Sequence, residues 1–432
     1  MRYYSTKNKS TFFSLKEAVL KGLPDDNGLF MPEYIPVLPQ NFLNDISHFT
    51  LSEIALEISR QFLADDLPSS VILEMVEKSI NFNAPLREID DRKYVLELFH
   101  GPTLAFKDFG ARFMAQLMSY LVRDETKKLT ILVATSGDTG SAVASGFLGV
   151  PNIEVIILYP SKKVSMLQEK QLTTSGQNIT ALEIEGTFDD CQRLVKTAFL
   201  DADLTSKYKL TSANSINISR LIPQSFYYVH AFGQMPDKTE PIVFSVPSGN
   251  FGNLTAGLLA KRMGLPVHHF IASTNINDIV PDYLTTGKFN PQASKQTISN
   301  AMDVGNPSNF YRMLELYDGS LEKMKKDITG YSFNDAQTAE AMKVVLKQKN
   351  YLLDPHGAVG YLGLDEYQKK YPNTRGIFLE TAHPAKFDDV VENILNLEVP
   401  LPDQLKSLLD KEKQARLMPT EFSVFKEYLL NR

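Results

Sequence analysis

From about residue 94 onward, short apolar segments alternate with helical patterns, and this alternation limits the possible folds more than any other feature of the chain. Apolar runs at 129–134 and 242–246 each stop at a glycine-rich turn, and each turn is followed by a helical pattern. Further strand-length runs occur at 94–99 and 155–159. Strand–turn–helix units build parallel sheets covered by helices on both faces. The sequence predicts an α/β fold long enough for two such sheets facing each other.

The two ends of the chain have a different character. Ser14-Leu-Lys-Glu17 matches the capping box that opens a helix, and residues 51–63 carry the apolar stripe of an amphipathic helix. We therefore expect a mainly helical section over residues 1–90. We expect two α/β subdomains over 91–390 and peripheral helices over 391–432.

Composition excludes several classes of protein. The chain has 432 residues and a formal net charge of -6, whereas a nucleic-acid-binding protein usually shows a basic stripe. No apolar run approaches the length of a membrane span, and the first residues do not resemble a secretory signal. Cys191 is the only cysteine, so an internal disulfide or a cysteine-rich metal site is not possible. We expect a cytoplasmic protein without a metal, a membrane or a nucleic-acid partner.

Lys107 is the most distinctive single residue. It lies in the segment His100-Gly-Pro-Thr-Leu-Ala-Phe-Lys-Asp-Phe-Gly110, where a strand ends and a helix begins. The neighbouring Phe106 and Phe109 predict apolar surroundings, which lower the pKa of a lysine and favour reaction with a carbonyl group. The residues alone leave open a surface lysine whose stem covers apolar surface.

Two glycine-rich turns each follow a strand and open a helix, at 135–142 and at 247–253. Small side chains and free N–H groups at a helix N-terminus suit an anion. Neither turn has the spacing of a dinucleotide site or of a P-loop, so a nucleotide-binding module is disfavoured. Either turn taken alone could be an ordinary strand–helix connection.

These segments, together with four others, resemble the threonine synthase family of pyridoxal-phosphate enzymes, which have a tryptophan-synthase-β-like fold. The other segments are Asn214-Ser-Ile-Asn-Ile-Ser-Arg220, Tyr159-Pro-Ser-Lys-Lys-Val-Ser-Met-Leu-Gln168, Ala301-Met-Asp-Val-Gly-Asn-Pro-Ser-Asn309 and Glu380-Thr-Ala-His-Pro-Ala-Lys-Phe387. The resemblance implies a lyase with pyridoxal 5'-phosphate in the cleft between the two α/β domains. It also implies conversion of O-phospho-L-homoserine and water to L-threonine and phosphate, the last step of threonine biosynthesis.

The resemblance also assigns roles to residues. Lys107 would be the catalytic residue and the attachment point of the cofactor. The other cofactor-binding residues would be Ser248, Gly249, Asn250, Phe251, Gly252, Asn253, Thr381 and Asp138. The substrate would be bound by Ser136, Thr139, Asn214, Ser215 and Arg220.

Asp138 departs from the wider class, which mostly has asparagine at this position, although many threonine synthases share the aspartate. An ionised Asp138 would repel the ring oxygen of the cofactor, so its role remains open. Two other functions also remain open: a threonine dehydratase of the same class, and an inactive relative that binds phosphorylated ligands. A monomer and a homodimer are both compatible with the sequence.

Overall fold

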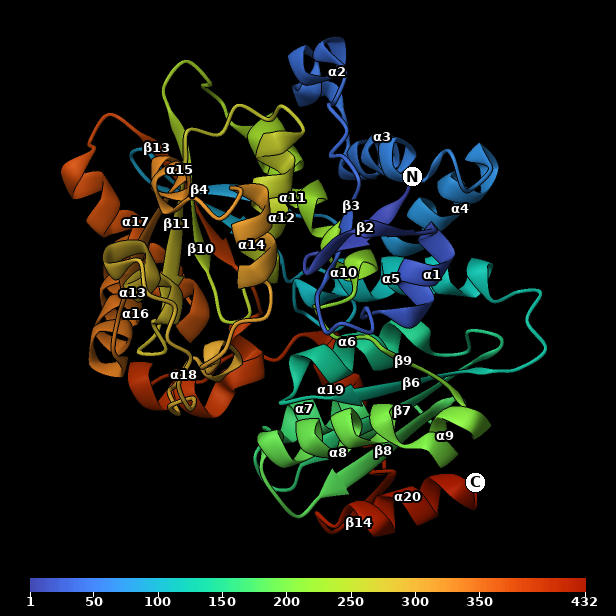
Figure 1. Cartoon of the computed structure of the whole chain (residues 1–432). Helices are drawn as coiled ribbons and strands as arrows, with labels where there is room; N and C mark the ends of the chain where they lie inside the picture. Colours follow the sequence, from blue (N-terminus) through green and yellow to red (C-terminus); the bar gives the residue numbers. More distant parts are fainter.

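The computed structural model describes residues 1–432, and its N-terminal part combines helices with a small sheet (Figure 1). The three-stranded antiparallel sheet has the order β2-β1-β3. Its strands and the accompanying helices are β1 (Tyr3–Ser5), β2 (Asn8–Phe13), β3 (Phe30–Pro32), α1 (Leu15–Lys21), α2 (Gln40–Asn44), α3 (Leu51–Leu63) and α4 (Ser69–Ser79). The predicted capping box at Ser14 and Glu17 opens α1. The small sheet was not predicted, because strands this short carry little apolar periodicity.

The larger of the two main sheets has six strands in the order β12-β11-β10-β13-β5-β4, all parallel except β4 at one edge. Its strands are β4 (Leu86–Asp90), β5 (Lys93–Glu97), β10 (Ile242–Pro247), β11 (His269–Thr274), β12 (Ile328–Ser332) and β13 (Arg375–Glu380). The surrounding helices are α11 (Gln224–Gln234), α12 (Gly252–Arg262), α13 (Ile279–Thr286), α14 (Phe310–Leu316), α15 (Leu321–Asp327), α16 (Asp335–Lys349) and α17 (Pro355–Lys370).

The second main sheet has five parallel strands in the order β14-β8-β7-β6-β9. Its strands are β6 (Leu129–Ala134), β7 (Ile153–Pro160), β8 (Ile179–Ile184), β9 (Lys209–Ser212) and β14 (Ala415–Met418). Its helices are α5 (Lys107–Leu121), α6 (Asp138–Phe147), α7 (Met166–Thr173), α8 (Phe188–Leu200), α9 (Ala202–Lys207) and α10 (Ile218–Leu221). The expectation of an α/β fold with two mainly parallel sheets is therefore confirmed.

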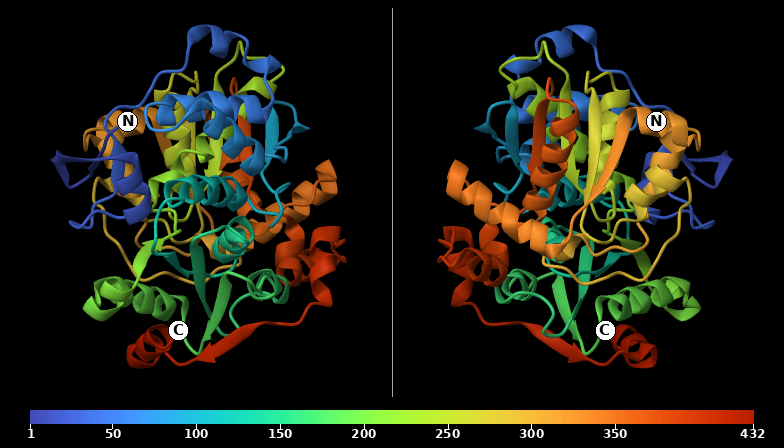
Figure 2. Two further views of the ribbon diagram at one scale, coloured as in Figure 1. Left: turned by 90° about the vertical axis from the view of Figure 1, so that its right-hand side faces the viewer. Right: turned by 90° about the vertical axis from the view of Figure 1, so that its left-hand side faces the viewer.

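The expectation that residues 391–432 form only helices is wrong. This segment contains α19 (Asp403–Leu409) and α20 (Phe422–Leu430), but β14 lies between them and pairs with β8. Figure 2 shows the C-terminal segment running from the part with the six-stranded sheet to the far edge of the five-stranded sheet. Only pairing with β8 makes this short, half-exposed segment a strand.

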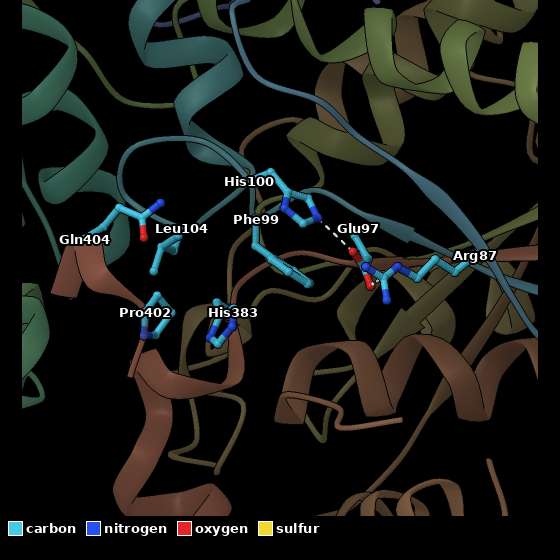
Figure 3. A pocket seen from close by; sticks show the side chains of 8 residues that line it. All are labelled: Arg87, Glu97, Phe99, His100, Leu104, His383, Pro402 and Gln404. Carbon is cyan, nitrogen blue, oxygen red and sulfur yellow. Dashed lines mark hydrogen bonds and ion pairs between the residues drawn. The ribbon is translucent and has the colours of Figure 1, made fainter. Parts of the chain in front are cut away.

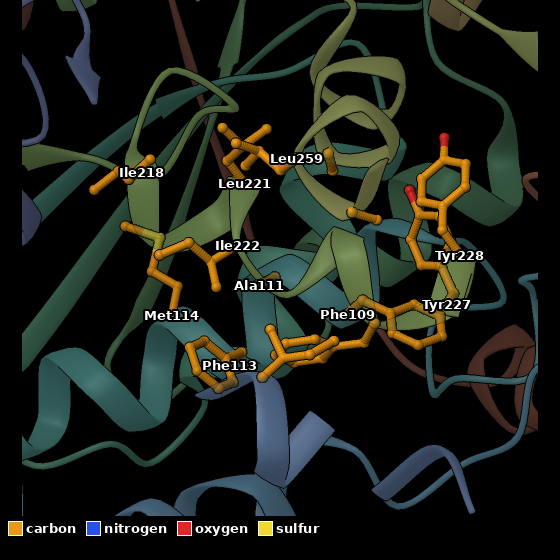
Figure 4. Close-up of a cluster of buried hydrophobic side chains, with 14 of the residues drawn as sticks. Phe109, Ala111, Phe113, Met114, Ile218, Leu221, Ile222, Tyr227, Tyr228 and Leu259 are labelled. Carbon is orange, nitrogen blue, oxygen red and sulfur yellow. The ribbon is translucent and has the colours of Figure 1, made fainter. Parts of the chain in front are cut away.

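Helix α5 connects the three parts of the molecule. Phe109 and Phe113 are fully buried and pack edge-to-face against Tyr227 and Phe226 of α11 (Figure 4). The same core cluster includes residues of the N-terminal section and of both main sheets. This packing fixes the N-terminal end of α5, where Lys107 lies. None of the helices is long and apolar enough to cross a membrane.

Three helices begin at predicted site residues. Helix α5 begins at Lys107, α6 at Asp138 and α12 at Gly252. The N–H groups in the first turn of a helix have no partner within the helix. The fold therefore places predicted site residues at the amino ends of three helices.

Candidate active site between the two sheets

Lys107 is held by a rigid turn that precedes α5. Its side chain is 16% exposed. The Asp108 carboxylate accepts hydrogen bonds from the Thr103 backbone N–H at 2.8 Å and from the Thr103 hydroxyl at 2.7 Å. A Cβ atom on Gly101 would lie 2.4 Å from Asp108 Oδ2, so only glycine fits there. The turn Gly-Pro-Thr and the acid after Lys107 therefore form one unit that orients the lysine.

Asp138 faces Lys107 and is itself held by two side chains that the sequence did not single out. Its Oδ2 atom lies 3.5 Å from Lys107 Nζ. Its Oδ1 atom lies 2.9 Å from Lys386 Nζ and accepts a hydrogen bond from Gln168 Nε2 at 3.0 Å. Gln168 and Lys386 both belong to segments that resemble the family, but no feature of either segment marked them as neighbours of Asp138.

Burial and neighbouring charges together lower the pKa values of both Lys107 and Asp138. Burial lowers the pKa of Lys107, the Asp138 carboxylate partly opposes this change, and Lys386 and Arg220 reinforce it. Burial alone would raise the pKa of Asp138, but the ammonium groups of Lys386 and Lys107 outweigh it and lower the pKa. Asp138 is therefore ionised at neutral pH, and Lys107 loses its proton more easily than an exposed lysine.

The loop that carries Asp138 leaves several N–H groups free. Gly137 has a φ of 139°, a conformation that favours glycine, and the Thr135 hydroxyl accepts hydrogen bonds from the Gly137 and Gly140 N–H groups. The N–H groups of Ser136, Asp138 and Thr139 donate to no atom of the chain. The side chains of Ser136 and Thr139 are partly exposed, and no hydrogen bond joins them to the other predicted site residues.

The turn after β10 forms a second cradle of free N–H groups. The N–H groups of residues 249–253 donate to no atom of the chain, and Phe251 adopts a left-handed conformation with a φ of 60°. Ser248 differs from the rest of this loop. Its N–H donates to the Ser273 carbonyl at 2.9 Å and its hydroxyl to the Val246 carbonyl at 2.9 Å. Ser248 therefore shapes the loop, while residues 249–253 provide the free donors.

The predicted substrate segment lies against this cradle. Asn250 Nδ2 donates to the Ser215 hydroxyl at 2.6 Å, and the Cβ position of Gly252 lies 3.5 Å from Ser215 Cβ. Asn214 and Ser215 lie on a turn and Arg220 lies on α10. The structure therefore brings the predicted phosphate-binding residues of the cofactor and of the substrate into direct contact.

Polar atoms near this turn are buried without partners. Arg220 is 3% exposed, its Nη1 donates to the Ala213 carbonyl at 2.7 Å, and burial lowers its pKa to about 10. Its Nε atom, Asn214 Oδ1 and Asn309 Nδ2 have no hydrogen-bond partner. Asn309 Nδ2 lies 3.4 Å from the Cβ position of Gly252. Buried polar atoms without partners are rare and indicate a missing ligand or water.

Asn309 and Arg312 were not predicted as site residues. Arg312 is fully buried and donates to the Ile216 carbonyl at 2.7 Å and to the Phe30 carbonyl at 3.0 Å. It therefore fastens the turn of Asn214 and Ser215 to the N-terminal sheet. Asn309 belongs to the segment 301–309 that resembles the family, but the contact of Arg312 with Ile216 depends on the tertiary structure.

The backbone of Thr381 contacts the backbone of the residue that precedes Lys107. Its carbonyl accepts a hydrogen bond at 2.8 Å from the N–H of Phe106, the residue before Lys107. Its side chain is buried, and its hydroxyl makes no hydrogen bond within the chain. Thr381 follows β13, whereas Lys107 opens α5, so this contact joins the six-stranded sheet to the lysine.

These residues fit pyridoxal phosphate. Residues 249–253 offer free N–H groups to a phosphate, and Lys107 can attach to the carbonyl carbon of the cofactor. The unpaired Asn309 Nδ2 lies beside the cradle, 3.4 Å from the Cβ position of Gly252, and offers a further donor to a second anion. The unpaired Arg220 Nε lies 3.2 Å from the Cβ position of Gly110 on α5. The arrangement can therefore hold a phosphorylated cofactor together with an anionic substrate.

A separate cavity of about 400 Å³ lies near His100 and His383 (Figure 3). His100 Nε2 is 2.7 Å from Glu97 Oε2, and His383 Nδ1 accepts a hydrogen bond from the Ala385 N–H at 3.1 Å. Burial lowers the pKa of His383 to about 4, so this residue is neutral at neutral pH. Both histidines therefore make local contacts, with residues two or three positions away in the chain.

Models of known families match nearly the whole chain. A model described as pyridoxal-phosphate dependent enzyme matches residues 83–379. A model of the threonine synthase N terminus matches residues 2–80, and one of the threonine synthase C-terminal region matches residues 357–429.

Individual relatives match over their full length. The chain is 46% identical to a threonine synthase of Haemophilus influenzae and 44% identical to one of Escherichia coli, in both cases over 100% of each chain. The crystal structure of the Escherichia coli threonine synthase superimposes with a TM-score of 0.93 at 43% identity, over 100% of both chains. The structure of a pyridoxal-phosphate-bound threonine synthase from Brucella melitensis gives a TM-score of 0.94 at 35% identity, over 100% of this chain and 99% of the other. Together with the arrangement of Lys107, the two N–H cradles and the buried arginine, these matches show that the chain belongs to the threonine synthase family of pyridoxal-phosphate-dependent enzymes.

Proposed function

We propose that this protein converts O-phospho-L-homoserine and water to L-threonine and phosphate, using pyridoxal phosphate bound at Lys107. The observation that carries this proposal is a contact between two groups of residues that can bind anions, 249–253 and 214–220. Asn250 of the first group donates a hydrogen bond to Ser215 of the second, and both groups lie beside Lys107, whose pKa is lowered. A site for a phosphorylated cofactor alone would need only one of these groups. The second fits the phosphate that distinguishes this substrate from serine or threonine.

The cradle formed by residues 249–253 binds the cofactor. The free N–H groups of residues 249–253 hold its phosphate, and the positive end of α12 adds to the attraction. Thr381 is proposed to donate a hydrogen bond from its hydroxyl to the ring nitrogen. When bound, pyridoxal phosphate supplies an electron sink that stabilises negative charge on the carbon atoms next to the amine.

The residues of the second group bind the phosphate of the substrate. Arg220 and Asn309 direct donors toward it, Ser215 lies at the contact with Asn250, and Arg312 keeps the turn in place. Charge on the phosphate grows as its bond to carbon breaks, so these donors stabilise the transition state more than the bound substrate. The N–H groups of Ser136 and Thr139 are free to bind the substrate carboxylate.

Lys107 moves the protons of the reaction. Its Nζ atom removes the proton from the substrate Cα and assists removal of one from Cβ, and the phosphate leaves from Cγ. Water then adds at Cβ, and protons return to Cγ and Cα to give threonine. The lowered pKa of Lys107 keeps the amine unprotonated more often and therefore ready to act as a base.

A single assay tests the proposal. The purified protein is mixed with pyridoxal phosphate and O-phospho-L-homoserine, and phosphate and threonine are measured together. We expect the two products in equal amounts. Ammonia and a keto acid in place of threonine would indicate a dehydratase, and cofactor binding without any product would indicate an inactive relative. The cytoplasmic location and the monomeric or homodimeric state stay predictions, and size-exclusion chromatography with light scattering tests the latter.

A further inference from the structure

Lys386 is a second buried lysine at the active site. Its side chain is fully buried, and it belongs to the short 3-10 helix Pro384–Phe387 that follows β13. Its Nζ atom makes two contacts, at 2.9 Å to Asp138 Oδ1 and at 2.7 Å to the Thr103 carbonyl. A buried ammonium group is costly unless it is paired. Asp138 is the only carboxylate with which Lys386 forms an ion pair.

The contacts of Lys386 close a ring of polar groups around Lys107. Asp108 holds Thr103, the Thr103 carbonyl accepts from Lys386, Lys386 pairs with Asp138, and Asp138 faces Lys107. The backbone of Lys386 is also fixed, because its carbonyl accepts a hydrogen bond from the Ser165 hydroxyl at 3.3 Å. The position of the Lys386 ammonium group is therefore determined by three separate elements of the fold.

This ring of polar groups affects the charge that Asp138 presents to the cofactor. An ionised carboxylate beside the cofactor would repel the ring oxygen, as the sequence indicated. The structure places a compensating positive charge within 2.9 Å of that carboxylate. The Asp138–Lys386 pair has no net charge, as an asparagine would have none, but its geometry is fixed from both sides of the cleft.

We propose that Lys386 is a positioning residue that neutralises Asp138 and holds its carboxylate beside Lys107, so that the pair acts as a neutral unit toward the cofactor. This proposal rests on the proposed binding of the cofactor at Lys107. It assigns Lys386 no contact with the substrate. The charged groups that face this point are Lys107, Asp108, Asp138, Arg220 and Lys386.

The test is a pH titration of the visible absorbance of the cofactor in the holoenzyme, without substrate. The midpoint reports the protonation of the nitrogen that joins Lys107 to the cofactor. Lys386→Met leaves the Asp138 charge uncompensated, which favours the protonated nitrogen, so the midpoint should rise by about 1 to 2 pH units. Asp138→Asn leaves the Lys386 charge uncompensated, so the midpoint should fall by a similar amount. The double variant should return close to the midpoint of the unmodified protein.

Lys93→Met provides a matched control, because Lys93 forms an ion pair at 2.6 Å with Asp365 away from the site. This change should leave the midpoint unchanged. If Lys386 only supports the local fold, Lys386→Met would reduce cofactor occupancy or stability but would not move the midpoint, and the proposal would be wrong.

A second comparison decides the matter if Lys386→Met does not fold. Asp138→Asn and the double variant then differ only at Lys386, and the proposal requires a higher midpoint in the double variant. Equal midpoints would overturn it. Because the titration needs no substrate, its result is independent of whether the protein forms threonine and phosphate.

Discussion

At the Lys107 end of the site, each buried charge has a partner within the chain, whereas at the Arg220 end some buried polar atoms have none. Lys107, Asp138 and Lys386 pair with one another. Arg220 Nε and Asn309 Nδ2 are buried and unpaired. A satisfied polar network fixes geometry, while buried donors without partners are costly until a ligand supplies acceptors. The comparison indicates that the first end is built for orientation and the second for capture of an anion.

The largest expected effect follows from removing the lysine at the paired end. Lys107→Ala should lower turnover by at least ~10³-fold, because it removes both the proposed base and the proposed attachment point of the cofactor. Turnover is measured as phosphate release. In the unmodified protein, borohydride reduction and peptide mapping should label the peptide that contains Lys107. Labelling of another lysine would contradict the assignment.

The next effect tests the unpaired end. Arg220→Ala should lower kcat/KM by roughly 10²–10³-fold, with a decrease in kcat as well as an increase in KM, because donors to the leaving phosphate act most strongly in the transition state. Arg220→Lys should recover little, since a point charge does not replace the two parallel N–H donors of a guanidinium group.

Cofactor occupancy, measured from the visible absorbance, should be unchanged in both Arg220 variants. Loss of cofactor in Arg220→Ala would show that Arg220 serves the cofactor phosphate. The division of the two anion-binding groups would then have to be reversed.

Two glycines in residues 249–253 differ in how closely the surrounding residues pack against them. A Cβ atom on Gly249 would lie 2.7 Å from Met302 Cα, so Gly249→Ala must displace the loop. Overpacking of this kind costs about 1–3 kcal/mol, and the cofactor affinity should fall roughly tenfold or more. A Cβ atom on Gly252 would make ordinary contacts at 3.4 Å and 3.5 Å with Asn309 and Ser215.

Gly252→Ala therefore serves as the matched control for Gly249→Ala, and the cofactor affinity of both variants is measured by absorbance titration. Gly252→Ala should affect cofactor affinity less than Gly249→Ala does. The reverse order would mean that the packing of Gly249 against residues 301–304 does not control the shape of the cradle.

The smallest effect is expected at Thr381, which has a free hydroxyl at the otherwise paired end. Thr381→Val keeps the shape but removes one neutral hydrogen bond, worth about 0.5–1.5 kcal/mol, so kcat should fall up to roughly tenfold or the ratio of products should change. Steady-state kinetics with product analysis measure this effect. Kinetics and cofactor spectra identical to those of the unmodified protein would exclude the proposed contact with the ring nitrogen.

The sequence alone determined the α/β fold, the helix starting next to Lys107 and the two turns with free N–H groups. These features are local: strand and helix periodicity, glycines at turns and a distinctive segment around one lysine are all encoded within about a dozen residues. The resemblance to the threonine synthases added the cofactor, the reaction and the proposed roles of Thr381, Asn214, Ser215 and Arg220.

Only the tertiary structure decided which side chains meet. Lys386 lies 248 positions from Asp138 in the chain, and Arg312 lies 96 positions from Ile216, so no local pattern could have paired them. The strand β14 is likewise determined by its neighbour, since this short segment gains its backbone partners only at the edge of β8. Ser248 was expected to offer its N–H group to the cofactor, but the pairing of β10 with β11 brings the Ser273 carbonyl to it instead. Local propensity determines whether a segment forms a helix or a strand. The partner of a buried charge or backbone donor, by contrast, is whichever group the tertiary fold places near it.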